Sequence, residues 1–305
     1  MKKRVKNVLV LLLAALLAAT AVLPAAAAFP DLKKTCDSAA SPAGAAIVYN
    51  LTDDVIQYKK NSTKQIKVAS ITKVLNACTA AQFLKAKDPI TVGNELSLMY
   101  WNSSTAPVRY GERYTFEQLL HAMLLPSGCD ATYTVAVNVA RKVKNDPALP
   151  IPEAITVFCG LMNDYAKELG CVNSHFVNPD GQDDERQHTC VKDVLLFTKK
   201  AYENEMFRQV VRMPKAEVQL VSGDVYIWEN TNKLLREDTE FYYPKAVGLK
   251  TGYTINAGYG IVAVAEEEDR CVLAVVCGCS EAAQRFTTAQ TLLQLGLFAA
   301  RRGAA

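Results

Sequence analysis

Strand-like patterns stand at both ends of this chain of 305 residues, and helix-like patterns fill the middle. A hairpin is predicted over 45–61, and two further strands over 259–265 and 271–277 are joined by an acidic turn. Periodic apolar residues predict helices over 115–125, 130–144, 152–170, 189–204 and 281–298. This order favours an α+β fold, in which one antiparallel sheet is made from both termini and a helical subdomain is inserted between them.

Residues 1–28 have the features of a secretory signal peptide. Four cations near the start precede an unbroken apolar run over 8–19, and small residues stand before a cleavage site between Ala28 and Phe29. Cleavage would leave residues 29–305 as one catalytic domain, working outside the cytoplasmic membrane. The alternative is a retained anchor, because residues 8–28 are about long enough to cross a bilayer. Contact with a membrane is then expected only through this leader.

The charge balance gives no reason to expect a nucleic-acid partner. The formal net charge is +3, and the four leader cations account for all of that excess. The nine cysteines are odd in number and have no zinc-ligand spacing, and the three histidines share no metal spacing. We therefore expect no metal and no cofactor, and we expect most thiols to be small buried side chains.

A hydroxyl and an amine stand three positions apart at the start of a predicted helix, at Ser70 and Lys73. Residues three apart lie on the same side of a helix, so the Lys73 amine can reach the Ser70 oxygen. A serine in the first turn also lies at the positive end of the helix dipole, which favours an alkoxide. The pair predicts a serine nucleophile with a lysine base. Alone this spacing is a weak signal, because a surface Ser and Lys on a helix would also produce it.

Two further short motifs follow in the chain. Ser127-Gly128-Cys129 lies in a loop between two predicted helices, and Lys250-Thr251-Gly252 ends a segment that can be extended. The motifs S-x-x-K, S-D-N and K-T-G together are the signature of penicillin-binding proteins and class A β-lactamases. Their order matches here, with Cys129 at the third position of the middle motif.

The sequence resembles the low-molecular-mass penicillin-binding proteins that are serine D-alanyl-D-alanine carboxypeptidases. The resemblance covers about Ala45 to Phe298. The stretches that carry it are Ala69-Ser70-Ile71-Thr72-Lys73, Pro126-Ser127-Gly128-Cys129-Asp130-Ala131, Phe176-Val177-Asn178-Pro179-Asp180-Gly181, Asn230-Thr231-Asn232-Lys233-Leu234-Leu235 and Gly248-Leu249-Lys250-Thr251-Gly252-Tyr253-Thr254. The resemblance implies the transpeptidase fold shared by penicillin-binding proteins and β-lactamases. It also implies peptidoglycan stem peptides as substrates and β-lactam antibiotics as covalent inhibitors.

The resemblance implies a role for each matching residue. Ser70 would be the acylated nucleophile, Lys73 its general base, and Ser127 the relay of a proton to the leaving D-alanine. Lys250 would supply positive charge, and Thr251 would help to hold the terminal carboxylate of the substrate. These expectations place three distant segments of the chain around one cleft.

The oxyanion hole would be formed by the backbone N–H groups of Ser70 and Tyr253, and removing one such donor typically costs about 2.7–4 kcal/mol. Cys129 stands where the family usually has Asn, and a thiol is a weaker donor and acceptor than an amide. We interpret this departure as tuning rather than inactivation, because one neutral hydrogen bond contributes only about 0.5–1.5 kcal/mol. The substrate-binding group implied by the resemblance is Cys129, Lys250, Thr251, Gly252 and Tyr253.

Three functions stay open from the sequence. The first is removal of the terminal D-alanine from stem peptides through an acyl-enzyme on Ser70. The second is a β-lactamase on the same scaffold, although the E-x-x-x-N pattern expected for class A deacylation is not found. The third is a catalytically degenerate cell-wall binding module, which only Cys129 supports. Tyr100 and Trp101 fit either a substrate groove or core packing.

Overall fold

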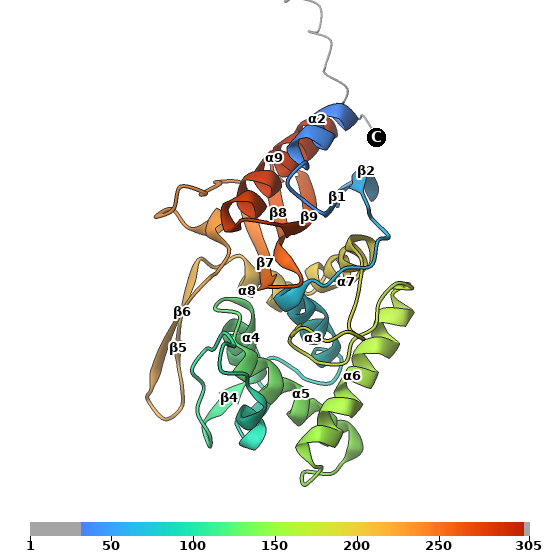
Figure 1. Ribbon diagram of the computed structural model, residues 1–305. Coiled ribbons are helices and arrows are strands. Elements are labelled where there is room, and N and C mark those ends of the chain that lie inside the picture. The colour runs from blue at the N-terminus through green and yellow to red at the C-terminus, as the bar shows by residue number, and fades with distance from the viewer. Residues whose placement is uncertain (1–31, 302–305) are drawn as a thin grey trace, which may run out of the picture. The chain divides into compact units, whose positions relative to one another are not determined.

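Five strands from opposite ends of the chain pair into one antiparallel sheet in the computed structural model, which describes residues 32–301 (Figure 1). Their order is β2-β1-β9-β8-β7, so β1 joins the N-terminal hairpin to the C-terminal strands. The bounds are β1 (Ala45–Asn50), β2 (Val55–Lys60), β7 (Ala246–Thr254), β8 (Gly258–Glu267) and β9 (Arg270–Cys279). At the centre of the β1–β9 pair, Val48 lies opposite Ala274. The predicted α+β fold, with a sheet made from both termini, is confirmed.

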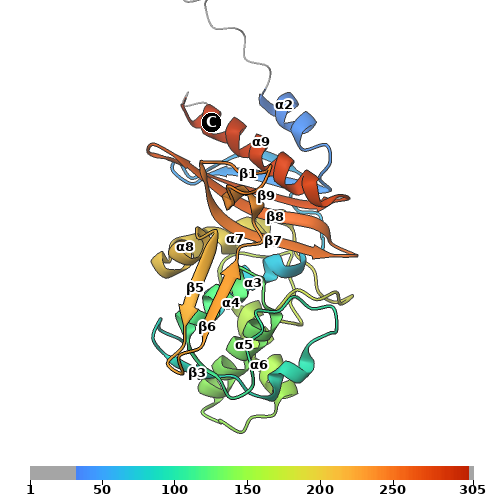
Figure 2. The same ribbon diagram turned by 90° about the vertical axis from the view of Figure 1, so that its left-hand side faces the viewer.

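Helices cover both faces of this sheet. Figure 2 shows α9 (Ala282–Arg301) lying across one face, where it packs on β9, β8 and β1. On the other face α7 (Val191–Tyr202) packs on β1 and β9, and α8 (Glu205–Val211) packs on β7. Because both faces are covered, the central residues of β8 and β9 are buried on both sides of the sheet and form uninterrupted apolar runs.

The helical subdomain is built around one buried helix, α3 (Thr72–Ala80). All nine of its residues are buried, because α4, α5, α6 and α7 pack around it. The surrounding helices are α4 (Phe116–Leu124), α5 (Cys129–Lys144) and α6 (Ile151–Glu168). A capping box stands at the start of α4, where Thr115 and Gln118 satisfy each other's backbone N–H groups.

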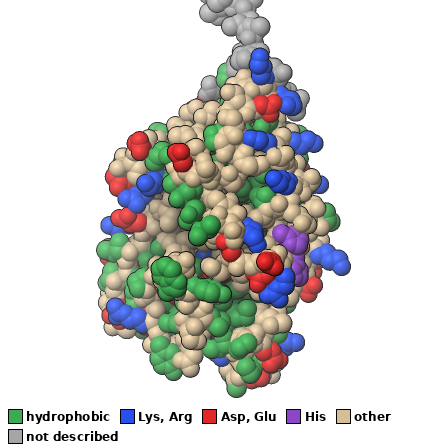
Figure 3. Space-filling model, in the orientation of Figure 1, with side chains coloured by type: hydrophobic (Ala, Val, Ile, Leu, Met, Phe, Trp, Pro, Cys, Tyr) green, Lys and Arg blue, Asp and Glu red, His purple; other side chains and the backbone are tan. Residues whose placement is uncertain are grey.

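The remaining elements of the described chain are short. They are α2 (Leu32–Ala39), η1 (Ala69–Ile71), β3 (Pro89–Thr91), η2 (Asn94–Leu98), β4 (Arg113–Thr115), β5 (Lys215–Gln219), β6 (Val225–Glu229) and η3 (Lys233–Leu235). Of these, β5 and β6 pair as an antiparallel hairpin. In the space-filling view, hydrophobic side chains gather over the middle and lower parts of the face shown, and charged side chains stand mostly around them (Figure 3).

The predicted signal peptide over 1–28 lies outside the described residues. Among the helices of residues 32–301, none combines the length and the apolar character that a membrane span needs. The extent of the catalytic domain, 29–305, stays a prediction.

Candidate active site

Ser70 and Lys73 face each other at the start of the buried helix. Ser70 lies in η1, the short 3₁₀ turn that leads directly into α3, and Lys73 lies in the first turn of α3. The Lys73 Nζ atom is 2.7 Å from the Ser70 Oγ atom. Lys73 is completely buried, whereas Ser70 keeps partial contact with solvent. The spacing of three residues therefore produces the contact that the sequence predicts.

The Lys73 amine has two further partners from distant segments. It lies 3.3 Å from the Sγ atom of Cys129, at the start of α5, and 3.2 Å from the backbone carbonyl oxygen of Asp180. With Ser70, three acceptors surround an amine that has three positions for donating. Contacts from three separate segments fix the position of the lysine and aim it at the serine oxygen.

The loop before α5 holds Ser127 in a strained conformation. Ser127 is buried and has a φ angle of 68°, in the left-handed region that few residues other than glycine adopt. Its carbonyl oxygen accepts a hydrogen bond of 2.6 Å from Ser104 Oγ. A Cβ atom on the next residue, Gly128, would stand only 2.7 Å from the carbonyl oxygen of Ala122. Strain of this kind persists where the surroundings over-determine a conformation, and it is common at functional sites.

Strand β7 brings a second buried amine to the site. Lys250 is fully buried, and its Nζ atom donates to the carbonyl oxygen of Thr251 at 3.0 Å. Burial, and then the positive charge of Lys73, hold the pKa of Lys250 well below its usual range. The guanidinium of Arg285 on α9 lowers it further. The hydroxyl of Thr251 is 2.7 Å from that of Thr231, which fixes its direction.

The edge strand β7 lies directly against η1. A Cβ atom added to Gly252 would stand 2.5 Å from the carbonyl oxygen of Val68 and 3.2 Å from the backbone nitrogen of Ser70. Only glycine permits this approach. The next residue, Tyr253, is half exposed, and its ring stacks on Tyr259 with 4.1 Å between ring centroids. The two predicted oxyanion donors, on Ser70 and Tyr253, therefore belong to segments in direct contact.

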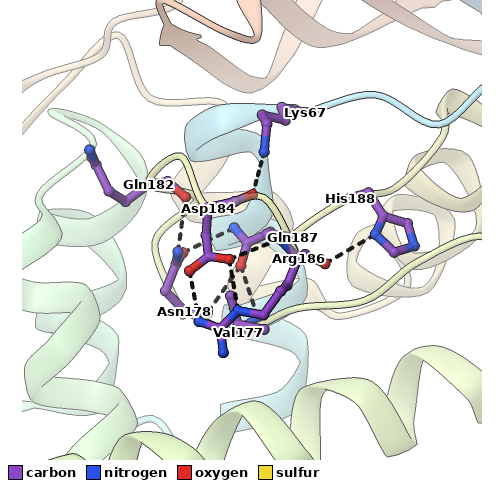
Figure 4. A network of polar contacts seen from close by, with 8 residues as sticks. All are labelled: Lys67, Val177, Asn178, Gln182, Asp184, Arg186, Gln187 and His188. Carbon is purple, nitrogen blue, oxygen red and sulfur yellow. Dashed lines mark hydrogen bonds and ion pairs between the residues drawn. The ribbon is translucent and has the colours of Figure 1, made fainter.

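The loop of residues 177–188 supports η1 from the other side, and Figure 4 shows its polar network. Gln187 Oε1 accepts hydrogen bonds from the backbone N–H groups of Val177 and Asn178 at 2.9 and 3.0 Å. The Asn178 amide donates to the Gln182 carbonyl oxygen at 2.9 Å, and Lys67 donates to that of Asp184. Cross-linked in this way, the loop can hold the Asp180 carbonyl oxygen against the Lys73 amine.

The structure thus brings all the predicted site residues into three adjoining segments. Ser70 lies in η1 and Lys73 in the first turn of α3. Ser127 lies just before α5 and Cys129 begins it, and Lys250–Tyr253 lies on β7. Sequence patterns assigned no role to the Asp180 carbonyl, to Thr231 or to Arg285, whose Nη1 atom lies 3.3 Å from the Gly252 carbonyl oxygen. Within residues 32–301, no group of three or more His, Cys, Asp or Glu side chains is placed to hold a metal ion.

Comparison with known proteins finds similarity along most of the chain. Residues 33–281 match the peptidase S11 family, described as D-alanyl-D-alanine carboxypeptidase. DacF of Bacillus subtilis, a D-alanyl-D-alanine carboxypeptidase, is 27% identical over 267 residues, which are 86% of this chain and 64% of that protein. A D-alanyl-D-alanine carboxypeptidase of Streptomyces strain K15 is 28% identical over 254 residues, which are 78% of this chain and 81% of that protein.

The structural comparison agrees with the sequence comparison. The crystal structure of the Streptomyces K15 DD-transpeptidase superposes with a TM-score of 0.75 and 26% identity, covering 84% of this chain and 97% of that one. Penicillin-binding protein D2 from Listeria monocytogenes, in its cefotaxime-bound form, has a TM-score of 0.68 at 24% identity. At this identity the comparison supports a shared fold and nothing further. This chain spans less than two thirds of the Bacillus relative.

Proposed function

The chain belongs to the D-alanyl-D-alanine carboxypeptidase family, and from this premise we propose that it removes the terminal D-alanine from peptidoglycan stem peptides through an acyl-enzyme on Ser70. The observation that carries the proposal is the 2.7 Å contact between Lys73 Nζ and Ser70 Oγ, made by a buried lysine that also contacts Cys129 and the Asp180 carbonyl oxygen. A serine hydroxyl is a weak nucleophile, and an adjacent base of this kind activates it.

In the proposed acylation, Lys73 acts after giving up one of its three protons, and its free lone pair takes the hydroxyl proton as Ser70 Oγ attacks the carbonyl carbon of the scissile peptide bond. The carbonyl oxygen becomes an oxyanion, which the backbone N–H groups of Ser70 and Tyr253 would stabilise. The bond to the terminal residue then breaks, and its nitrogen receives a proton through Ser127 to leave as D-alanine. Water hydrolyses the resulting ester, which regenerates the Ser70 hydroxyl and releases the shortened peptide.

The terminal carboxylate of the substrate would be held by Lys250 and Thr251. A buried amine with a depressed pKa lacks a counter-charge, and an arriving carboxylate supplies one. Substrate binding would therefore favour the protonated form of Lys250. Arg285, in contact with the Gly252 carbonyl oxygen, would add to the positive field at the same end of β7.

The proposal extends to partners and location. β-Lactam antibiotics present a strained amide followed by a carboxylate, so the same groups would direct them to Ser70 as covalent inhibitors. The stem-peptide substrate belongs to the cell wall, and we propose that the protein works outside the cytoplasmic membrane. Cleavage of the 1–28 leader, or its retention as an anchor, remains part of this proposal.

A fluorescent penicillin tests the function directly. A stable adduct that disappears in Ser70→Ala, together with D-alanine release from a peptide ending in D-Ala-D-Ala, is the expected result. Rapid turnover of the penicillin would instead indicate a β-lactamase, and no adduct with the folded protein would indicate a degenerate binding module. Mass spectrometry with and without penicillin would identify the acylated peptide and the N-terminal residue in one measurement.

A further inference from the structure

Two neighbouring aromatic side chains are exposed beside the candidate active site. Trp101 is 96% exposed and Tyr100 is 55% exposed, so the core packing that the sequence also allowed is wrong for Trp101. The other tryptophan, Trp228, is only 3% exposed. Single exposed apolar residues are common, but a fully exposed tryptophan next to a half-exposed tyrosine is an amphipathic surface available to a partner.

The backbone presents these rings on a fixed turn. The N–H of Ser103 donates to the carbonyl oxygen of Tyr100 at 3.0 Å, which closes a tight turn with Trp101 at its tip. We call residues 100–103 the aromatic turn. The residue that follows, Ser104, fixes this turn to the site, because its Oγ donates to the Ser127 carbonyl oxygen at 2.6 Å and its carbonyl accepts from Cys129 N at 2.9 Å. A ligand bound at the candidate active site would therefore pass near the turn.

The position of Tyr100 agrees with this placement. Tyr133 lies on α5 one turn after Cys129, and its hydroxyl pKa is raised by burial first, with the charges of Asp180, Cys129 and Tyr100 adding to the effect. Tyr100 thus lies within electrostatic range of the first turn of α5, which carries Cys129. The aromatic turn is therefore next to the segment that holds Ser127 and Cys129.

The segment that carries the rings has no charged side chain over residues 96–108. Asn102 and Thr105, both exposed, supply an amide and a hydroxyl close to Trp101 in the chain. A flat aromatic face surrounded by amides and hydroxyls suits a sugar, whose apolar C–H face stacks on the ring while its hydroxyl and acetamido groups form hydrogen bonds. A membrane-binding surface would instead carry Lys and Arg.

We propose that the aromatic turn binds the glycan strand that carries the stem peptide, an N-acetylated amino-sugar chain, with Trp101 as the stacking platform. The inference rests on the proposed function, because that function brings a sugar-linked peptide to the cleft. The turn would position polymeric substrate without contacting the reacting atoms.

Kinetics with two matched substrates test the inference. One substrate carries the stem peptide on a short glycan strand, and the other is the same peptide without sugar. Trp101→Ala should raise KM for the glycan-linked substrate about fivefold to tenfold, as the loss of one aromatic stacking contact predicts. KM for the free peptide and the rate of penicillin acylation should stay within about twofold, since neither ligand has sugar to stack. An equal rise for both substrates, or for neither, would overturn the proposal.

A control and a binding measurement complete the test. Val221 is fully exposed in the turn between β5 and β6. It supplies the control Val221→Ala, which should leave both KM values unchanged. Trp101 is the exposed member of the two tryptophans, so its fluorescence should respond saturably to an oligomer of N-acetylglucosamine. A response to anionic lipid vesicles but not to the oligomer would contradict the inference and indicate a membrane surface. Because this titration needs no turnover, it separates failure of glycan binding from failure of the peptidase function.

Discussion

At the scale of single residues, the site is organised around the buried amine of Lys73. Its partners are a hydroxyl, a thiol and a backbone carbonyl, which come from three parts of the chain. The thiol of Cys129 is the weakest acceptor of the three. The quality of the contact at Cys129 should therefore affect how firmly the lysine is held against Ser70.

We expect Cys129→Asn to keep or raise the rate of acylation by penicillin. The amide oxygen can accept from Lys73 and the amide nitrogen can donate to a substrate, which is worth about 0.5–1.5 kcal/mol, or up to roughly tenfold in rate. Cys129→Ala, which removes the Sγ atom 3.3 Å from Lys73, is the matched comparison and should be slower than the Asn variant. A slower Asn variant would contradict the idea that the thiol only tunes the site. Unchanged penicillin labelling after bulky alkylation of Cys129 would show that the thiol lies outside the cleft.

Lys250 should give stability a measurable pH dependence. Its pKa is held below its ordinary value of 10.5 in the folded protein, so unfolding takes up a proton in the window between the two values. Stability therefore rises with pH in that window, by at most about 1.4 kcal/mol per pH unit for one group. In Lys250→Met this rise should be missing when free energies of unfolding in urea are compared between about pH 7 and pH 8.5. Lys59→Met, which removes an exposed lysine from β2, controls for the loss of one lysine.

Some of these residues could be predicted from sequence, for a physical reason. Ser70 and Lys73 are three apart on one helix, so local geometry fixes their contact. The Asp180 carbonyl has no side-chain signature, because any residue supplies the same oxygen. Arg285 lies on α9, far along the chain from Gly252, and only the folded sheet brings them together.

At the scale of elements, the site depends on how closely β7 approaches η1. Gly252→Ala should lower the acylation rate at least tenfold, because its Cβ would stand 2.5 Å from the Val68 carbonyl oxygen and backbone would have to move. Overpacking of this kind also destabilises a fold by about 1–3 kcal/mol. Gly160→Ala is the control: nothing lies within 4 Å of its added Cβ on α6, and alanine should stabilise the helix by about 0.5–1 kcal/mol. An unchanged acylation rate in Gly252→Ala would mean that the close approach of β7 to η1 is not needed for acylation.

The elements also show where sequence patterns stop being informative. The capping box of α4 and the two C-terminal strands were predictable because their signals are local. α8 was not predicted, because its seven residues are too short to establish a helical period. The close contact of β7 with η1 was not predictable either, since it depends on the absence of one side chain at Gly252.

At the scale of the whole molecule, the unusual feature is the number of buried thiols. All nine cysteines are free in the described structure, and eight of them are buried. Burial raises their pKa from the ordinary value of 9.0 in every case: to about 12 for Cys78, Cys159, Cys171 and Cys271, to about 11 for Cys36, Cys190 and Cys279, and upward for Cys129 and Cys277. All nine thiols therefore change the stability of the folded protein in the same direction at alkaline pH.

Below pH 9 these thiols keep their protons in the folded protein and in the unfolded chain, so their contribution to stability is fully present. Above that value the unfolded chain releases protons that the folded protein retains, and stability falls as pH rises through the folded pKa values, by at most about 1.4 kcal/mol per pH unit for each thiol. Lys250 has the opposite effect on stability, but it involves one proton, whereas the thiols involve nine. The net stability therefore falls as pH rises. Under reducing conditions, the urea midpoint should thus drop sharply between about pH 9 and pH 10, before most tyrosines ionise. Thiolate absorbance should appear with unfolding and not before it. A constant midpoint over this range, or thiolate signal from the folded protein, would mean that the thiols are accessible to water.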